Sequence, residues 1–231
     1  NSVTISTIMA YPLWLRQLLH ENSVRAATPA AARLGRRLGS LKVQTVCRAA
    51  RCPNLGDCWS AGTATFLLLG NICTRGCGFC NLSPGRPGPV DEDEPWRLLR
   101  AVRELGLRHV VLTSVTRDDL PDGGAGHFAE TIRVLRRGAG PLSIEVLTPD
   151  FQGDVAALET LAAAAPDLWG HNLETVPRLY PGIRRGAGYE RSVQLLAWIN
   201  NHHGHIPTKS GLMLGLGETS AEIEAVLLDL R

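Results

Sequence analysis

The distribution of cysteine constrains this chain more than any other feature of its sequence. All six cysteines lie between Cys47 and Cys80, in two groups of three, and the rest of the 231-residue chain contains none. A secreted domain stabilised by disulfides is usually small and spreads its cysteines over the fold. Dense cysteine groups in a chain of this length indicate metal binding instead. We therefore expect metal or iron–sulfur chemistry between these two residues.

The second group reads Cys73-Thr-Arg-Gly-Cys77-Gly-Phe-Cys80 and follows an apolar run that predicts a buried strand at residues 65–70. A structural zinc site normally has four ligands, and no fourth cysteine or suitably spaced histidine lies nearby. Three thiolates suit a four-iron cluster with one open iron, because closed clusters take four cysteines. An open iron can bind a substrate or a cofactor. Zinc is the main alternative.

The first group places Cys47, Cys52 and Cys58 at a C-x4-C-x5-C spacing. This spacing is typical of neither a zinc finger nor a common ferredoxin. Proline, asparagine and glycine lie between its last two cysteines, so we predict a loop over residues 47–58. The spacing of this group alone does not identify its metal.

Five predicted strands alternate with five predicted helices from residue 65 onward. The strands are expected at residues 65–70, 109–113, 142–147, 168–172 and 210–214, and the helices at 95–105, 126–137, 154–165, 192–200 and 220–230. Asp154 and Ser192 are the predicted N-caps of two of these helices. Alternation of this kind indicates a parallel sheet covered by helices.

Polar or glycine-rich segments accompany the ends of the predicted strands, at residues 73–80, 113–119, 145–151, 171–175 and 215–219. Functional groups at the carboxyl ends of successive strands favour a barrel over a doubly wound sheet with one crevice. We therefore predict an α/β fold, with a partial parallel (β/α) barrel at residues 61–231 and an N-terminal extension at 1–60. No strand follows the fifth unit to close the sheet, so we expect the sequence to stop before the end of this domain. The alternative is a partner chain that supplies the rest.

Charge and hydropathy argue against two classes of partner. The formal net charge is only +2, which argues against nucleic acid or an anionic membrane. No apolar stretch approaches the roughly 20 residues of a membrane helix. The first ten residues carry no charge, so we expect no secretory signal and a cytoplasmic protein. A trimmed mitochondrial or plastid transit peptide is the alternative, because this segment is poor in acidic residues.

Both cysteine groups resemble motifs of known enzymes. The second resembles the signature of the radical S-adenosylmethionine (SAM) superfamily, C-x3-C-x2-C with an aromatic residue before the last cysteine. The first is similar to the auxiliary-cluster motif of the lipoyl synthase family, and the resemblance covers roughly residues 43–231. Further motifs that resemble this family are Cys52-Pro-Asn-Leu, Gly62-Thr-Ala-Thr-Phe66, Thr113-Ser-Val, Arg117-Asp-Asp119, Asp122-Gly-Gly124, Pro149-Asp-Phe151, His171-Asn-Leu-Glu174 and the segment from Thr208 to Glu218.

The resemblance implies a radical SAM barrel that holds SAM and two 4Fe-4S clusters. Cys73, Cys77 and Cys80 would bind the cluster whose open iron chelates SAM. The 5′-deoxyadenosyl radical formed there would abstract hydrogen from C6 and C8 of an octanoyl chain, and the cluster at the first group would donate two sulfur atoms. The implied partners are an octanoylated lipoyl carrier protein or domain, an electron donor such as flavodoxin or ferredoxin, and an iron–sulfur carrier protein.

The same resemblance assigns further contacts to SAM or the substrate. They are Phe79 near the adenine, Thr113 and Ser114 at the amino group, Glu145 and Asn172 at the barrel mouth, and Gly211, Met213 and Gly215 along the adenine. The alternatives are ordinary: Phe79 could pack in the core, and polar residues at strand ends are more often caps or turns. Three histidines, at positions 202, 203 and 205, are expected in a solvated loop rather than at a metal.

One departure and three alternatives accompany this resemblance. The family ends in an Arg-Ser-Ser-Tyr segment whose serine ligates the auxiliary cluster, and this sequence does not contain it. We therefore expect activity to depend on that segment. The alternative functions are another radical SAM enzyme that inserts sulfur, an inactive fragment, and a non-enzymatic iron–sulfur or zinc protein.

Overall fold

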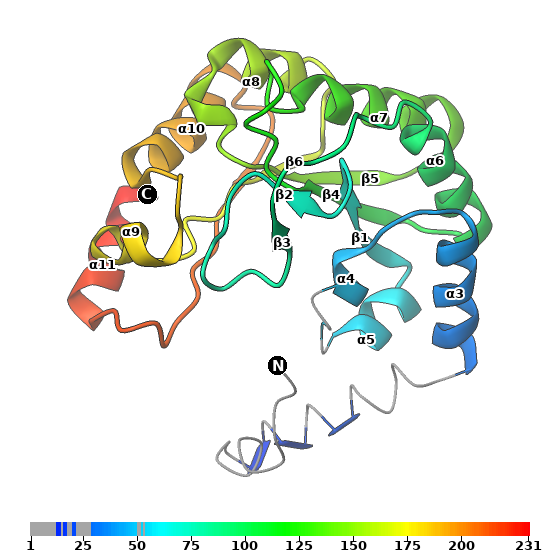
Figure 1. Cartoon of the computed structure of the whole chain (residues 1–231), viewed down its shortest axis with the longest axis horizontal. Coiled ribbons are helices and arrows are strands. Elements are labelled where there is room, and N and C mark those ends of the chain that lie inside the picture. Colours follow the sequence, from blue (N-terminus) through cyan, green and yellow to red (C-terminus); the bar gives the residue numbers. More distant parts are fainter. Residues whose placement is uncertain (1–12, 15, 18–19, 22–28, 50–51, 53) are drawn as a thin grey trace.

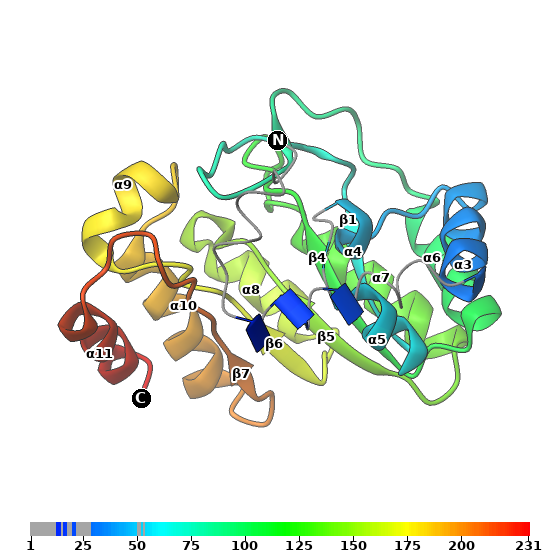
Figure 2. The ribbon, with the colours of Figure 1, turned by 90° about the horizontal axis from the view of Figure 1, so that it is seen from below.

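The computed structural model describes residues 13–14, 16–17, 20–21, 29–49, 52 and 54–231. Its main sheet has five parallel strands in the order β1-β4-β5-β6-β7. The strands are β1 (Thr63–Leu68), β4 (His109–Ser114), β5 (Ser143–Leu147), β6 (Leu168–Gly170) and β7 (Thr208–Lys209). Figure 2 shows β1 and β7 at opposite ends of this strand order. The predicted parallel sheet and its five strand–helix units are confirmed.

Helices cover one face of the curved sheet, as expected for a partial barrel (Figure 1). The helices that follow the five strands are α6 (Glu94–Leu105), α7 (Ala125–Gly138), α8 (Val155–Ala162), α10 (Tyr189–His202) and α11 (Ser220–Asp229). Short elements connect them: η1 (Phe151–Gly153), η2 (Pro177–Leu179) and α9 (Tyr180–Ile183). None of the helices in the described residues is long and apolar enough to cross a membrane.

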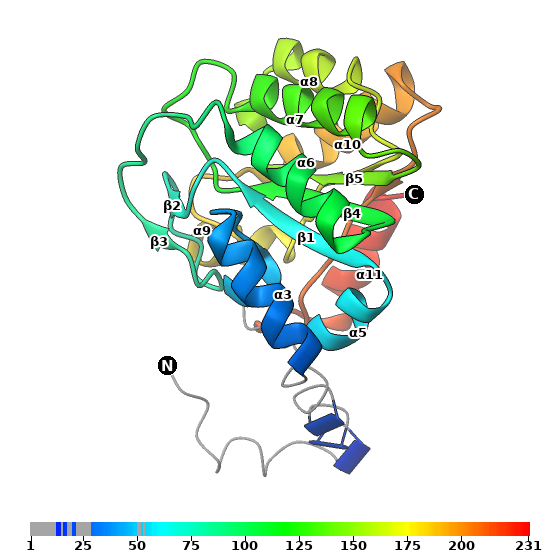
Figure 3. The same ribbon diagram turned by 90° about the vertical axis from the view of Figure 1, so that its right-hand side faces the viewer.

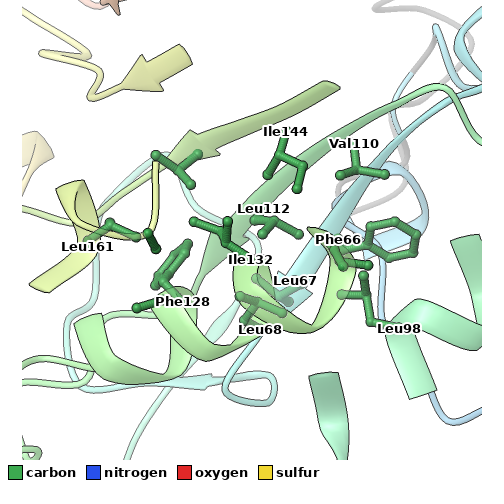
Figure 4. Close-up of a cluster of buried hydrophobic side chains, with 14 of the residues drawn as sticks. Phe66, Leu67, Leu68, Leu98, Val110, Leu112, Phe128, Ile132, Ile144 and Leu161 are labelled. Carbon is green, nitrogen blue, oxygen red and sulfur yellow. The ribbon is translucent and has the colours of Figure 1, made fainter. Parts of the chain in front are cut away.

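The hydrophobic core lies between the sheet and these helices (Figure 4). Leu112 and Ile144 on the central strands are fully buried, as are Phe128 and Ile132 on α7. Because successive side chains of a strand point to opposite faces, Val111, Thr113 and Glu145 face the concave side. The helices therefore pack on the convex side of the sheet, and we expect functional side chains on its concave side.

The fifth strand lies earlier than predicted, at Thr208–Lys209 rather than at 210–214. The reason is that the following residues bond to the segment after β6 instead of continuing the sheet. Leu212 forms an isolated parallel bridge with Glu174, and the Met213 N–H donates to the Glu174 carbonyl at 2.8 Å. This displacement brings two glycine-rich and polar segments together at the mouth of the barrel.

One predicted helix cap is confirmed and the other is wrong. Asp154 caps α8, because its side chain accepts a hydrogen bond from the Ala156 N–H at 2.9 Å. Ser192 is not a cap, because α10 begins three residues earlier, at Tyr189. Ser192 is instead buried within the helix, and its hydroxyl donates to the Gly188 carbonyl at 2.9 Å.

The loop predicted over residues 47–58 is wrong for the part that the structure describes. Two short helices lie there, α4 (Val46–Ala49) and α5 (Leu55–Ser60), and a longer one precedes them, α3 (Pro29–Ser40). Asn54 sits at the start of α5, so this turn-forming residue marks a helix boundary. Trp59 is buried at the other end of that helix.

The region of the first cysteine group packs on the edge strand of the sheet. Thr45 forms an antiparallel bridge with Phe66, and the Leu67 N–H donates to the Gln44 carbonyl at 3.0 Å. Figure 3 shows α3 and α5 beside β1, on the side away from α7. The edge of β1 is therefore covered by residues that precede it. The division into domains at residue 60 stays a prediction.

Candidate active site

The second cysteine group occupies a loop that leaves the end of β1. Leu69 and Gly70 turn the chain with positive φ angles of 65° and 89°, and the Leu69 N–H donates to the Glu94 carboxylate at 2.9 Å. The loop is closed by a small two-stranded parallel sheet of β2 (Ile72–Cys73) and β3 (Ser83–Pro84), which the sequence did not predict. These elements hold the cysteines at the carboxyl end of the main sheet (Figure 1).

Backbone N–H groups point at two of the three sulfur atoms of this loop. Cys73 Sγ accepts from the Arg75 N–H at 3.4 Å and from the Thr116 N–H at 3.3 Å. Cys80 Sγ accepts from the Leu82 N–H at 3.5 Å. Hydrogen bonds to sulfur are one of the means by which proteins set the properties of iron–sulfur clusters. The surroundings of these thiols therefore fit a cluster.

The third thiol of the loop, Cys77, lies within electrostatic range of the other two. Burial raises the pKa of Cys77, and the neighbouring thiols of Cys73 and Cys80 raise it further, whereas the charges of Arg184 and Arg75 lower it. A bound iron would reverse this balance, because a coordinating thiol is deprotonated. The loop thus combines three thiols that interact electrostatically with two nearby cations.

The first cysteine group also converges. Cys47 is buried, and its thiol donates to the Thr65 carbonyl on β1 over 4.0 Å. The Cys52 N–H donates to the Cys47 carbonyl at 3.0 Å. Burial raises the pKa of Cys58, and the charges of Cys47, Cys52 and Asp57 raise it further. The three thiols of this group are therefore close enough to interact electrostatically, and Cys47 contacts β1.

All six cysteines are free thiols. Among the residues that the structure describes, no group of three or more His, Cys, Asp and Glu side chains is arranged to hold a single metal ion. Each thiolate of an iron–sulfur cluster binds its own iron, so the sulfur atoms of a cluster site need not share one centre. The predicted histidine loop is only partly correct, because His202 is the last residue of α10. His203 follows this helix and pairs with Glu159 of α8 at 3.0 Å.

The segments that carry the two cysteine groups are in direct contact. Asn81, which follows Cys80, donates from its side-chain amide to the carbonyl of Ala49 at 3.0 Å. Ala49 is the last residue of α4, the helix that contains Cys47. The two groups therefore lie on adjoining segments on the same side of the sheet.

The predicted SAM contacts divide into two sets. The first set lies on the two segments that pair beyond β6 and β7, and comprises Asn172, Gly211, Met213 and Gly215. These segments are close together, because a Cβ atom at Gly211 would lie 3.0 Å from the Asn172 side-chain oxygen. Phe79 is 38% exposed, so it does not pack in the core. The Asn172 side chain also forms a hydrogen bond with Glu174.

The other predicted contacts are engaged within the protein. The Thr113 hydroxyl donates to the Leu147 carbonyl at 2.8 Å, which ties β4 to β5. The Glu145 carboxylate pairs with Lys209 at 2.8 Å and lies 3.5 Å from His109. The Ser114 hydroxyl is buried and has no hydrogen-bond partner among the described residues. The roles of all three stay predictions.

Arg184, which follows α9 (Tyr180–Ile183), is a further functional candidate. Its guanidinium donates to the Tyr180 hydroxyl at 2.9 Å and the Ser192 hydroxyl at 3.0 Å. A third contact, at 3.4 Å, reaches Nε2 of His171. These partners are neutral, and no carboxylate in the described part of the chain forms an ion pair with it. The charge of Arg184 lowers the pKa of Cys77 and that of the Glu174 carboxyl, in each case against the larger effect of burial.

His171 keeps this arginine in place as a neutral imidazole. Its side chain is fully buried, and Nδ1 donates to the Thr148 carbonyl at 2.8 Å, which leaves Nε2 as an acceptor. Burial, followed by the charge of Arg184, lowers the pKa of His171 to about 4. The imidazole is therefore uncharged near neutral pH and can accept a hydrogen bond from Arg184.

Comparison with known proteins finds similarity to one superfamily. The profile of the radical SAM superfamily matches residues 67–230. The chain is 54% identical to lipoyl synthase of Nitrosococcus oceani over 90% of this chain and 65% of that protein. It is 52% identical to lipoyl synthase of Pelobacter propionicus, over 95% of this chain and 68% of that one. The chain thus spans less than two thirds of the first of these relatives.

A solved structure with a similar fold is that of methylornithine synthase. It superimposes with a TM-score of 0.52 and 16% sequence identity, and the match covers 97% of this chain and 61% of that one. At this level of identity, the likeness concerns the fold alone.

Proposed function

Because this chain belongs to the lipoyl synthase family of the radical SAM superfamily, we propose that it inserts two sulfur atoms, at C6 and C8, into a protein-bound octanoyl chain. The observation that carries this proposal is the contact between the two cysteine segments, through Asn81 and Ala49. Hydrogen abstraction and sulfur donation act on the same carbons of one substrate, because each C–S bond at C6 or C8 replaces a C–H bond there. The residues that hold the two reagents must therefore lie close together.

Cys73, Cys77 and Cys80 are the proposed ligands of the cluster that binds SAM. When bound, this cluster and SAM supply the radical that removes hydrogen from unreactive carbons. The chain contributes the thiolates, the N–H groups that donate to Cys73 and Cys80, and the cation of Arg184. We assign Arg184 to the SAM carboxylate, because a half-buried guanidinium with neutral partners gains most from an anionic ligand.

The first cysteine group is the proposed site of the second cluster, whose role would be to supply sulfur. Cys47, Cys52 and Cys58 provide three ligands, and the fourth is expected in a segment of the family that this sequence does not contain. The SAM pocket would be completed by the remaining predicted contacts, which are Phe79, Thr113, Ser114, Glu145, Asn172, Gly211, Met213 and Gly215.

The proposed partners follow from the same chemistry. The substrate is presented by an octanoylated lipoyl carrier protein or domain. Electrons come from a donor such as flavodoxin or ferredoxin, and an iron–sulfur carrier protein renews the second cluster. These reactions are proposed for the cytoplasm, as for a bacterial enzyme.

Product formation with an octanoyl-lysine peptide tests this function. The wild-type chain and a version extended by the C-terminal segment of the Nitrosococcus relative are reconstituted anaerobically, each with Cys52→Ala and Cys73→Ala variants. We expect lipoyl product from the extended protein and none from either of its variants. SAM cleavage should survive Cys52→Ala and be lost in Cys73→Ala.

Two results would overturn the proposal. Lipoyl formation by the extended Cys52→Ala protein would exclude the first group as the sulfur-donor site. Cleavage of SAM with sulfur insertion into another substrate, and none into the octanoyl peptide, would identify a different sulfur-inserting enzyme. Product from the unextended chain would show that the fourth ligand lies within these 231 residues or on a partner.

A further inference from the structure

Arg75, inside the second cysteine group, joins the cysteine loop to the ends of two strands. Its guanidinium forms a two-pronged ion pair with Asp118 after β4, at 2.6 and 2.7 Å, and reaches Asp150 after β5 at 2.8 Å. The Arg75 side chain is 7% exposed and that of Asp150 is fully buried. Arg191, on α10, completes the network through a 3.1 Å contact with the second oxygen of Asp150.

Removing these charged groups from water costs free energy, so a contribution to stability alone does not explain why the network is present. A buried ion pair is often no more stabilising than apolar side chains of similar volume. An arginine is, however, well suited to span two carboxylates, because its planar fork offers five donors in fixed directions. The network therefore fixes where Arg75 lies relative to both strand ends.

The segment around Arg75 also runs alongside the segment around Asp118. The Thr74 N–H donates to the Thr116 carbonyl at 3.0 Å, and the Asp118 N–H donates to the Thr74 hydroxyl at 3.1 Å. Within this pairing, the N–H groups of Arg75 and Thr116 approach Cys73 Sγ from the two segments. The Arg75–Asp118 ion pair thus holds together the two backbones that donate to one sulfur atom.

The aliphatic part of Arg75 packs against the loop that follows Arg184. A Cβ atom at Gly186 would lie 3.1 Å from Arg75 Cδ, and Gly186 has a φ angle of +80°. Any larger residue there would meet both a close contact and a strained backbone. Arg75 therefore lies at the junction of the cysteine loop, the two strand ends and the loop that carries Arg184.

We propose that Arg75 is a positioning residue that aims two N–H groups at Cys73 and thereby raises the reduction potential of the cluster bound by Cys73, Cys77 and Cys80. This inference rests on the proposed function. Reduction makes the cluster more negative, and N–H donors stabilise the more negative state. Loss of the arginine geometry should therefore shift the potential to more negative values.

The midpoint potential of this cluster, measured without SAM by redox titration with EPR detection, tests the inference. All proteins carry Cys52→Ala, so that only the cluster of the second group contributes. We expect Arg75→Met and Arg75→Lys both to shift the potential downward, because an ammonium cannot bridge two carboxylates as a guanidinium does. Arg178→Met is the control and should leave the potential unchanged, because Arg178 pairs with Glu222 at 2.7 Å and lies outside the Arg75 network.

The Asp118→Asn variant distinguishes the effect of the backbone geometry on the reduction potential from the effect of charge. Removing a negative charge near the cluster would by itself raise the potential, whereas loosening the two backbone segments lowers it. A lower potential in Asp118→Asn supports the inference, and a higher one overturns it, as does a wild-type potential in Arg75→Lys. If the Cys52→Ala parent holds no cluster at all, the proposed function fails together with this inference. A loaded parent with unchanged variants rejects the inference alone.

Discussion

Arg184 contacts the hydroxyls of Tyr180 and Ser192 and the imidazole of His171, and its charge acts on Cys77. We expect Arg184→Met to weaken SAM binding roughly tenfold to a hundredfold, because a hydrogen bond to a charged group contributes about 1.5–3 kcal/mol. Equilibrium dialysis of SAM against the reconstituted protein measures this. Arg185→Met is the control, because Arg185 is adjacent and exposed. Equal loss of affinity in both variants would argue against a specific carboxylate contact.

Asp150 links protein stability to pH. Burial raises the pKa of Asp150, but Arg75, the hydrogen bond from the Gln152 N–H and the charge of Arg191 together outweigh it and hold the pKa below its ordinary value. A carboxyl with a depressed pKa stabilises the fold above its unfolded pKa, near 4, and this contribution is lost as the pH falls through the folded pKa. The wild-type protein should therefore lose stability as the pH falls from about 4 toward 2.

Asp150→Asn should remove this dependence and lower the free energy of unfolding by about 3 kcal/mol at neutral pH, because it breaks a buried ion pair. Urea unfolding at a series of pH values gives both quantities. Asp154→Asn, an exposed N-cap exchange, should change neither, since asparagine caps as well as aspartate. If the free energy of unfolding of Asp150→Asn fell with acid pH as steeply as that of the wild type, other carboxyl groups would be responsible for the pH dependence.

The partners of Arg75 show why the sequence predicted the cysteine groups but not the residues that position them. The cysteines of each group lie within a short stretch of sequence, so their spacing indicates metal binding directly. Arg75 contacts residues 43 and 75 positions away. Such pairings depend on which strand ends meet in space, and a single sequence does not contain that information.

Helix α11 begins with a capping box, in which the Thr219 side chain accepts from the Glu222 N–H and the Glu222 side chain accepts from the Thr219 N–H. Thr219→Ala should lower the free energy of unfolding by about 1 kcal/mol. Urea denaturation monitored by circular dichroism measures the change. Ser220→Ala, one residue later, provides the control. A difference below the experimental error between these two variants would mean that α11 frays before the rest of the protein unfolds.

The elements with regular hydrophobic periodicity were predicted well, and the irregular ones were not. Helix α6 was expected at 95–105 and lies at Glu94–Leu105, because its apolar residues recur at helical spacing against the sheet. The segment 47–58 shows no such period, and its two short helices are stabilised by packing on β1 rather than by their own pattern. The short strand β7 was misplaced because its neighbours bond to the loop after β6.

The molecule as a whole places two cysteine groups on adjoining segments at the open side of a partial barrel, with helices securing the other face (Figure 1). The cysteine groups therefore lie apart from the hydrophobic core, which packs between the sheet and its helices. Both the barrel and the cysteine groups could be predicted from the sequence, because alternating strands and helices and dense cysteine spacing are strong local patterns. The contact between the groups became apparent only in the folded chain.

Iron and sulfide analysis of anaerobically reconstituted protein tests the central claim most directly. The protein extended by the C-terminal segment of the Nitrosococcus relative should hold about eight irons, as two 4Fe-4S clusters require. Cys52→Ala and Cys73→Ala should each hold about four, and only Cys52→Ala should still cleave SAM. Zinc without sulfide, or a Cys73→Ala protein that cleaves SAM as fast as the wild type, would contradict the account.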